Sequence, residues 1–347
     1  MSAPQPKAAR PTGRGPAGDD LLARAVAERA LSASDDPALD AAVARLSSAA
    51  GEALAGLVFF GSRRTGAARA NVWSAYDVFV VVEEYRAFYE SLRRAGLSGK
   101  RPGLMALVSG WLAPTQYSLR FEAEGVHVKA AVIRRDAWRR ETSPRRRDHF
   151  CIGRLCQPTR ILYSRNEAAR GLLLQGLFFA HRETWRWSRP WLPATFDAAA
   201  YGRSALRTSM RWEVRPEPAG RADTLWEAQR QLQVPVFETL LEELADRGEL
   251  APVPDHPGTF TPTRPATPLE RFRLQAYFRW SIVRATSRWL KHVVTFEGWL
   301  DYIVHKASRH TGEAITLSAR ERRWPWIFAW GRFFRYLRHK DQQGEGR

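Results

Sequence analysis

The sequence predicts an α+β fold: a mixed sheet domain, then a helical domain, then a basic helical C-terminal region. Short apolar runs at 57–60, 78–82, 126–133 and 160–163 favour strands. Longer segments with helical patterning, at 21–54, 167–187, 196–210 and 222–247, surround and follow them. From residue 266 onward the helical segments are rich in arginine and aromatic residues.

Charge and cysteine content indicate which kinds of partner and compartment to expect. The chain has 347 residues, which is enough for two or three domains with hydrophobic cores. Its 54 Lys+Arg against 36 Asp+Glu give a net charge of +18, so we expect an anionic partner: nucleic acid, a lipid surface or a phosphorylated substrate. Cys151 and Cys156 fit no metal-ligand spacing, which indicates reduced thiols in a reducing compartment. No apolar run is long enough to span a bilayer.

Composition also sets the expected domain boundaries. The Pro-, Gly-, Ala- and Arg-rich residues 1–20 predict a disordered tail. A sheet domain is expected at 21–175 and a helical domain at 176–265, where the helix at 222–247 precedes a small hairpin and so resembles a winged-helix module. Residues 266–347 form the basic, aromatic helical region.

The stretch from 57 to 84 carries the main chemical signal. An apolar strand ends at Gly61-Ser62, a basic loop follows, and a second apolar strand begins after Asp77, which is the pattern of nucleotidyltransferases. Gly61 lets the backbone approach a triphosphate closely, and Ser62 with nearby backbone N–H groups can hold phosphate oxygens. Asp77 would bind the Mg²⁺ that bridges those phosphates.

Two features of this pattern leave alternatives open. Most nucleotidyltransferases carry Asp-x-Asp here, but Ala75 occupies the first acidic position, so Gly61-Ser62 could also be an ordinary turn with Asp77 at a strand edge. The segments 117–123 and 126–133 predict a hairpin around Glu124-Gly125. Lys129 falls in its second strand, where many of these enzymes have a third acid, and a structural role for Lys129 is the alternative.

The C-terminal segment has the composition of a helix at a membrane interface. Its sequence WPWIFAWGRFFRYLRHK places aromatic residues on one broad apolar face beside cations. The alternative is that these aromatic residues belong to a core. The residues expected to contact the membrane are Trp326, Trp330, Phe333, Phe334 and Arg335.

Five segments, in order, resemble the mitochondrial-type CDP-diacylglycerol synthases, which are phosphatidate cytidylyltransferases also described as mitochondrial translocator assembly and maintenance proteins. That family likewise has one acid in place of Asp-x-Asp, so Ala75 conforms to it. The resemblance covers residues 55–245. The similar segments are Phe60-Gly61-Ser62, Tyr76-Asp77-Val78-Phe79, Val128-Lys129 through Val132-Ile133, Gly153-Arg154-Leu155 with Pro158, and Glu213-Val214-Arg215, in which Glu replaces the family's Asp.

The resemblance implies transfer of CMP from CTP to phosphatidic acid, giving CDP-diacylglycerol and pyrophosphate with Mg²⁺ as cofactor. Gly61 and Ser62 would cradle the CTP phosphates, and Asp77 with Glu213 would hold the metal. The implied catalytic residues are Asp77, Lys129 and Glu213, and the implied nucleotide-binding residues are Gly61, Ser62, Arg154 and Arg215. The acceptor phosphate is already ionised near pH 7, so no general base is required, which accounts for a lysine in place of the third acid.

Three other functions remain open from the sequence. The chain could transfer a nucleotide to another acceptor, or be a non-catalytic basic protein that binds nucleic acid through the winged-helix-like region, or be an inactive relative that binds lipid. We favour CTP, an anionic phospholipid and a membrane surface over nucleic acid as partners. The expected location is the cytoplasm, peripheral on the inner face of the membrane, with the matrix side of the mitochondrial inner membrane as the alternative.

Overall fold

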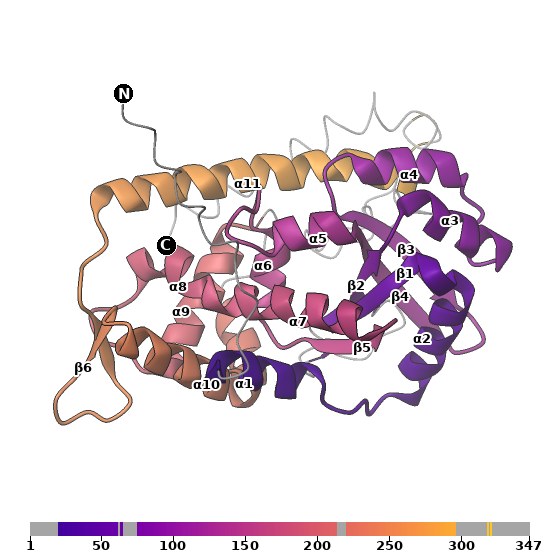
Figure 1. Cartoon of the computed structure of the whole chain (residues 1–347). Coiled ribbons are helices and arrows are strands. Elements are labelled where there is room, and N and C mark those ends of the chain that lie inside the picture. Colours follow the sequence, from indigo (N-terminus) through magenta and orange to yellow (C-terminus); the bar gives the residue numbers. More distant parts are fainter. Residues whose placement is uncertain are drawn as a thin grey trace, which may run out of the picture. The chain divides into compact units, whose positions relative to one another are not determined.

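The computed structural model of the protein describes residues 20–61, 63–64, 75–213 and 220–295, together with Ser318 and Arg320 (Figure 1). The chain divides into two compact units, Met1–Lys291 and His292–Arg347. The fold of the first unit is α+β, as predicted. The tail expected at residues 1–20 lies outside the described part of the chain except for Asp20.

Two helices begin the described chain, and each starts at an aspartate. Helix α1 is Leu21–Ala30 and α2 is Pro37–Ala50. The side chain of Asp20 accepts a hydrogen bond from the backbone of Ala23, and that of Asp36 accepts one from Leu39, both at 3.1 Å. These bonds satisfy amides that a helix leaves unpaired at its N-terminus. A short 3₁₀ turn, η1 at Gly51–Ala53, then leads into the sheet.

The sheet has five strands in the order β3-β4-β2-β1-β5. β2 is central, antiparallel to β1 and parallel to β4, while β3 and β4 form the predicted antiparallel hairpin. Helices α3 (Tyr85–Arg94) and α4 (Pro102–Gly110) connect β2 to β3. The strands are β1 Leu54–Phe60, β2 Tyr76–Val82, β3 Thr115–Phe121, β4 Val126–Arg134 and β5 Arg160–Ser164.

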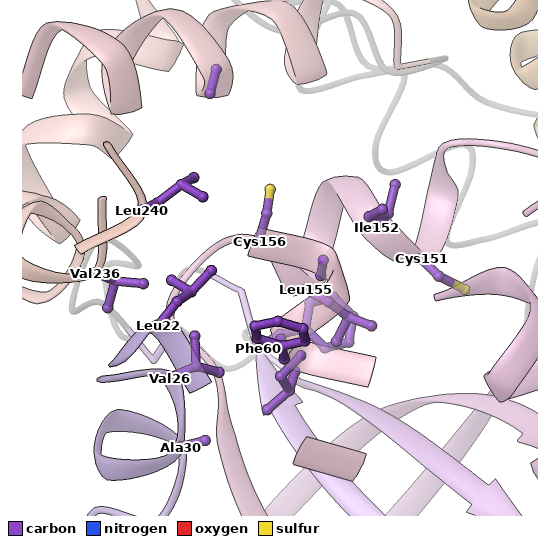
Figure 2. Close-up of a cluster of buried hydrophobic side chains, with 14 of the residues drawn as sticks. Leu22, Val26, Ala30, Phe60, Cys151, Ile152, Leu155, Cys156, Val236 and Leu240 are labelled. Carbon is purple, nitrogen blue, oxygen red and sulfur yellow. The ribbon is translucent and has the colours of Figure 1, made fainter. Parts of the chain in front are cut away.

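Both faces of the sheet are covered, which explains why β1 and β2 read as nearly continuous apolar runs. On one face, Phe59, Val78 and Val80 pack in a cluster that includes residues of α2, α3 and α4. On the other face, Phe60 and Phe79 belong to a second cluster, which we call the helical-side core. Figure 2 draws part of this core, with side chains from α1, α6 and α10 around Phe60.

A helical half follows the sheet and supplies most of the helical-side core. Helix α10 is long and contains Pro235, and the hairpin expected after it forms as β6 and β7. The elements are α5 Arg135–Glu141, α6 Phe150–Leu155, α7 Glu167–Arg182, α8 Thr184–Ser188, η2 Arg189–Trp191, α9 Ala198–Arg211, α10 Arg221–Asp246, β6 Leu250–Pro252 and β7 Phe260–Pro262.

The helical-side core joins the sheet to this helical half without interruption. It runs from Leu22 in α1 to Phe278 in the last described helix, so it crosses the boundaries expected at 175/176 and 265/266. The separate sheet and winged-helix-like domains therefore stay predictions. No described helix combines the length and apolar character needed to cross a membrane.

The last described helix, α11 (Pro268–Thr295), is attached by a buried polar seam. Asp148 is nearly inaccessible and pairs with two arginines of α11, Arg284 at 3.0 Å and Arg288. The backbone N–H of His149 donates to the hydroxyl of Ser281 at 2.9 Å. These bonds fix α11 against the segment that leads into α6.

The contact between α9 and α10 leaves no room for a side chain at Gly202. A Cβ atom there would lie 2.6 Å from Cζ3 of Trp226 and 2.7 Å from Cδ2 of Phe237, and both rings are buried. We expect Gly202→Ala to lower the free energy of unfolding by about 1–3 kcal/mol through overpacking. Urea denaturation would measure it.

Gly171 provides the matched control, because it lies on α7 with nothing within 4 Å of an added Cβ. Gly171→Ala is expected to raise stability by about 0.5–1 kcal/mol, since alanine loses less entropy than glycine in a helix. Equal effects of the two substitutions would contradict the tight α9–α10 contact.

Candidate functional site

The end of β1 and the start of β2 meet at Gly61 and Asp77. Phe60 is paired with Asp77 across the two strands, and Gly61 then turns with φ +89°. A Cβ atom at Gly61 would lie 2.8 Å from Oδ2 of Asp77 and 3.3 Å from its Cβ. Position 61 therefore requires glycine for two reasons: the positive φ angle of the backbone and the close approach of the carboxylate.

Lys129 lies beside Asp77 on the neighbouring strand, because β2 and β4 pair in parallel with these two residues in register. Side chains two residues apart on a strand share a face. Phe79 and Ala131, two residues further along each strand, belong to the helical-side core. Asp77 and Lys129 thus lie on the same face of the sheet, just beyond its apolar part, and place a carboxylate and an ammonium side by side.

A serine and a histidine extend this polar row across the sheet. Ser118 of β3 is paired with Lys129, and its hydroxyl lies 2.8 Å from Nε2 of His127. Burial, together with the positive charges of Lys129 and Arg120, lowers the pKa of His127 to about 4. The imidazole is therefore neutral at physiological pH. The sequence analysis missed Ser118, although the hairpin register around Glu124-Gly125 would have placed it opposite Lys129.

Arg154 and Glu213 form a second group on the same side of the sheet. They make an ion pair at 3.1 Å between α6 and the turn that follows α9, and both side chains are largely buried. The guanidinium carbon of Arg154 lies 4.1 Å from the centre of the Phe150 ring. That ring is 6.3 Å from Phe79, two residues beyond Asp77. The structure thus connects the Arg154–Glu213 pair to the Asp77 strand through two aromatic rings.

Several expected site residues lie outside the described part of the chain. They are Ser62 and Arg215 of the expected nucleotide site, and Trp326, Trp330, Phe333, Phe334 and Arg335 of the expected membrane contact.

The donor set suits a magnesium ion that arrives with a nucleotide. The described residues contain no group of three or more His, Cys, Asp or Glu side chains placed to hold a metal. Mg²⁺, however, is commonly bound by one or two carboxylates together with substrate phosphates and water. Asp77, with its carboxylate against a glycine turn, and Glu213, in its ion pair with Arg154, are two such carboxylates.

Comparison with known proteins assigns no family: no protein-family model matches the chain, and no curated protein matches it significantly.

The Gly61–Asp77 contact predicts that substitutions at these two positions have non-additive effects on the free energy of unfolding. Gly61→Ala is expected to lower the free energy of unfolding by about 2–4 kcal/mol, the sum of a left-handed alanine and a clash with the carboxylate. Asp77→Ala removes the clash, so the double variant should lose only about 1 kcal/mol relative to Asp77→Ala alone. Urea denaturation of all four proteins would measure the coupling, and strictly additive effects would contradict the contact.

The lowered pKa of His127 predicts that the folded protein loses stability in acid. The folded protein takes up this proton near pH 4, whereas the unfolded chain takes it up near 6.5. The contribution of His127 to stability is therefore fully present above pH 6.5 and is lost as the pH falls toward 4. Nitrogen-detected NMR of the imidazole would follow the titration directly.

Lys129→Gln should raise the pKa of His127, because it removes one of the two neighbouring charges. Lys100→Gln is the control, since Lys100 is not among the charges that act on this ring. A native His127 that titrates near 6.5 would show that the ring is not held in its neutral form.

Proposed function

We propose that the protein transfers CMP from CTP to phosphatidic acid, with release of pyrophosphate, at a membrane surface. The observation that carries the proposal is the close approach of the Asp77 carboxylate to the glycine turn after β1, with Lys129 in register beside it. A turn without a side chain lets the carboxylate, and a metal-bound phosphate beside it, lie close to the backbone.

The chain's own residues would divide the work by charge. Asp77, with Glu213, would hold Mg²⁺, which when bound neutralises triphosphate charge and helps pyrophosphate to leave. Lys129 would face the anionic acceptor, and Arg154, held in place by Glu213 and Phe150, would bind a phosphate oxygen. Because Glu213 already pairs with Arg154, nucleotide binding would rearrange or share this carboxylate.

In the reaction, a phosphate oxygen of phosphatidic acid attacks the α-phosphorus of CTP, and the bond to the β-phosphate oxygen breaks. The acceptor oxygen is ionised near pH 7, so no side chain has to remove a proton. A second acid beside Asp77 would repel this acceptor, whereas Lys129 attracts it. His127 stays neutral and adds no charge of its own.

The net charge of +18 supports a membrane-surface location, because phosphatidic acid makes a bilayer surface negative. We propose that the protein is peripheral on the inner face of the cytoplasmic membrane, with the matrix face of the mitochondrial inner membrane as the second possibility. The expected contact through residues 326–335 remains part of this proposal.

Transfer of label from α-³²P-labelled CTP into lipid tests the function. The purified protein would be incubated with phosphatidic-acid vesicles and Mg²⁺, and the labelled CDP-lipid would be separated and counted. Asp77→Asn, which keeps the shape of the side chain, is expected to lower the rate by about a hundredfold or more. Lys129→Met should also lower the rate of transfer. It should leave the affinity for CTP unchanged, because Lys129 would act on the acceptor.

Asp223→Asn is the matched control, because it removes a surface carboxylate of α10 that pairs with Arg207 at 2.7 Å and is not among the candidate site residues. Its rate should equal that of the native protein. No labelled lipid from the native protein would refute this acceptor. Label that persists in Asp77→Asn would refute the assignment of the site.

A further inference from the structure

Two helices of the Met1–Lys291 unit expose apolar side chains on their outer sides. Leu104 and Leu107 on α4 and Trp111 just after it are exposed, and Leu107 is 74% exposed. On α11, Phe272 is 67% exposed. Leu269, Trp280 and Val283 are also exposed along α11.

The exposed residues of α11 lie along one side of the helix. Positions 269, 272, 276, 280 and 283 follow the three- and four-residue spacing of a single face, over about 21 Å of helix. Phe278, Ser281 and Arg288 point the other way and are buried. The polar seam that attaches α11 therefore leaves this apolar side facing outward.

The segment just after α4 contacts the later part of α11. The amine of Lys291 in α11 donates to the backbone carbonyl of Trp111, just after α4, and to the hydroxyl of Thr115 at 2.9 Å. Arg288 donates to the carbonyl of Leu112 at 3.2 Å. Figure 1 shows α4 beside the end of α11 along one edge of the unit. We call the exposed residues of these two helices the α4–α11 face.

Cations border this face. Arg273 and Arg279 are exposed on α11, one on each side of the apolar residues. Neither pairs with a carboxylate among the described residues. The one acid within Pro268–Thr295, Glu270, pairs with Arg189 at 2.6 Å. At the start of α4, an open hollow of about 560 Å³ is lined by Arg86, Arg93 and Arg94, with Glu90, Pro102 and Gly103.

We propose that the α4–α11 face docks on the surface of a negatively charged phospholipid bilayer. Its leucine, valine, phenylalanine and tryptophan side chains enter the interface, while the bordering arginines meet lipid phosphates. This surface is formed by other residues than the 326–335 segment, and the docking does not depend on the transfer reaction.

The charge and chemistry of the face favour this partner over two others. A second copy of the chain would bring the same exposed arginines together, and like charges repel. A nucleic acid would use the arginines and tryptophans, but aliphatic side chains such as Leu107 and Val283 gain nothing from contact with phosphates. A bilayer surface uses both the apolar and the cationic groups.

A fluorescent reporter in the full-length protein would locate the contact. Cys151 and Cys156 are buried, so an environment-sensitive dye would react with a cysteine introduced as Ala276→Cys on the exposed side of α11. Gln231→Cys, exposed on α10, is the matched control. The probes are phosphatidylcholine vesicles with and without phosphatidylglycerol, which is not the acceptor of the proposed reaction.

The fluorescence emission of the dye at 276 should shift to shorter wavelength only with the vesicles that contain phosphatidylglycerol. The emission of the dye at 231 should not change with either kind of vesicle. A dye at 276 that is already shielded without vesicles would overturn the proposal, because the chain itself would then cover the face. A response at 276 to nucleic acid, with none to vesicles, would overturn it in favour of a nucleic-acid surface.

Vesicle sedimentation would test the individual residues. Leu107→Glu with Phe272→Glu is expected to abolish binding, while Leu232→Glu, a partly exposed leucine of α10, should leave it unchanged. Replacing Arg273 and Arg279 by Gln should weaken binding about 25-fold, at roughly fivefold for each cation. Native binding by these variants would refute the docking surface, whatever the outcome of the CTP assay.

Discussion

The position of β2 determines most of this structure. It is the central strand, and its two partners run in opposite directions, with β1 antiparallel and β4 parallel to it. All of its residues except Asp77 are buried, so its register is set by packing on both faces. A shift by one residue would move Asp77 into the opposite face and Val78 out of its core, and would separate Asp77 from Lys129.

The helical half adds Arg154 and Glu213 to the candidate site from one side of the sheet. Phe150 of α6 lies between Phe79, on the Asp77 strand, and the guanidinium of Arg154. The preceding residue pair, Asp148 and His149, is held by α11 through buried ion pairs and a backbone hydrogen bond. The position of Arg154 therefore depends on contacts that extend from the sheet to residues more than a hundred positions later in the chain.

The sequence predicted the local elements well. The strands around Gly61 and Asp77 and the hairpin bearing Lys129 carry strong local patterns, and the structure contains them. The Gly61–Asp77 approach was foreseeable, because a glycine at the end of one strand and an acid at the start of its neighbour meet in any tight antiparallel pairing. Local pattern also located helix α10 and the small hairpin after it.

The sequence carries no comparable pattern for contacts between segments that are far apart in the chain. The parallel pairing that puts Lys129 beside Asp77 joins strands some fifty residues apart, and apolar runs do not specify which neighbour they choose. The ion pair between Arg154 and Glu213 and the burial of His149 depend on how α6, α9 and α11 pack together. The sequence also did not predict that one core continues through the expected domain boundaries. Composition indicates where linkers lie, but it does not indicate which segments pack together.

The arginines of α11 differ in how they should respond to ionic strength. Arg284 and Arg288 meet Asp148 away from solvent, where dissolved ions screen an ion pair weakly. Arg273 and Arg279 face water, where the Debye length shortens from about 10 Å at 0.1 M salt to about 3 Å at 1 M. Concentrated salt would therefore release an anionic partner from the outer side of this helix while leaving the helix itself attached to the protein.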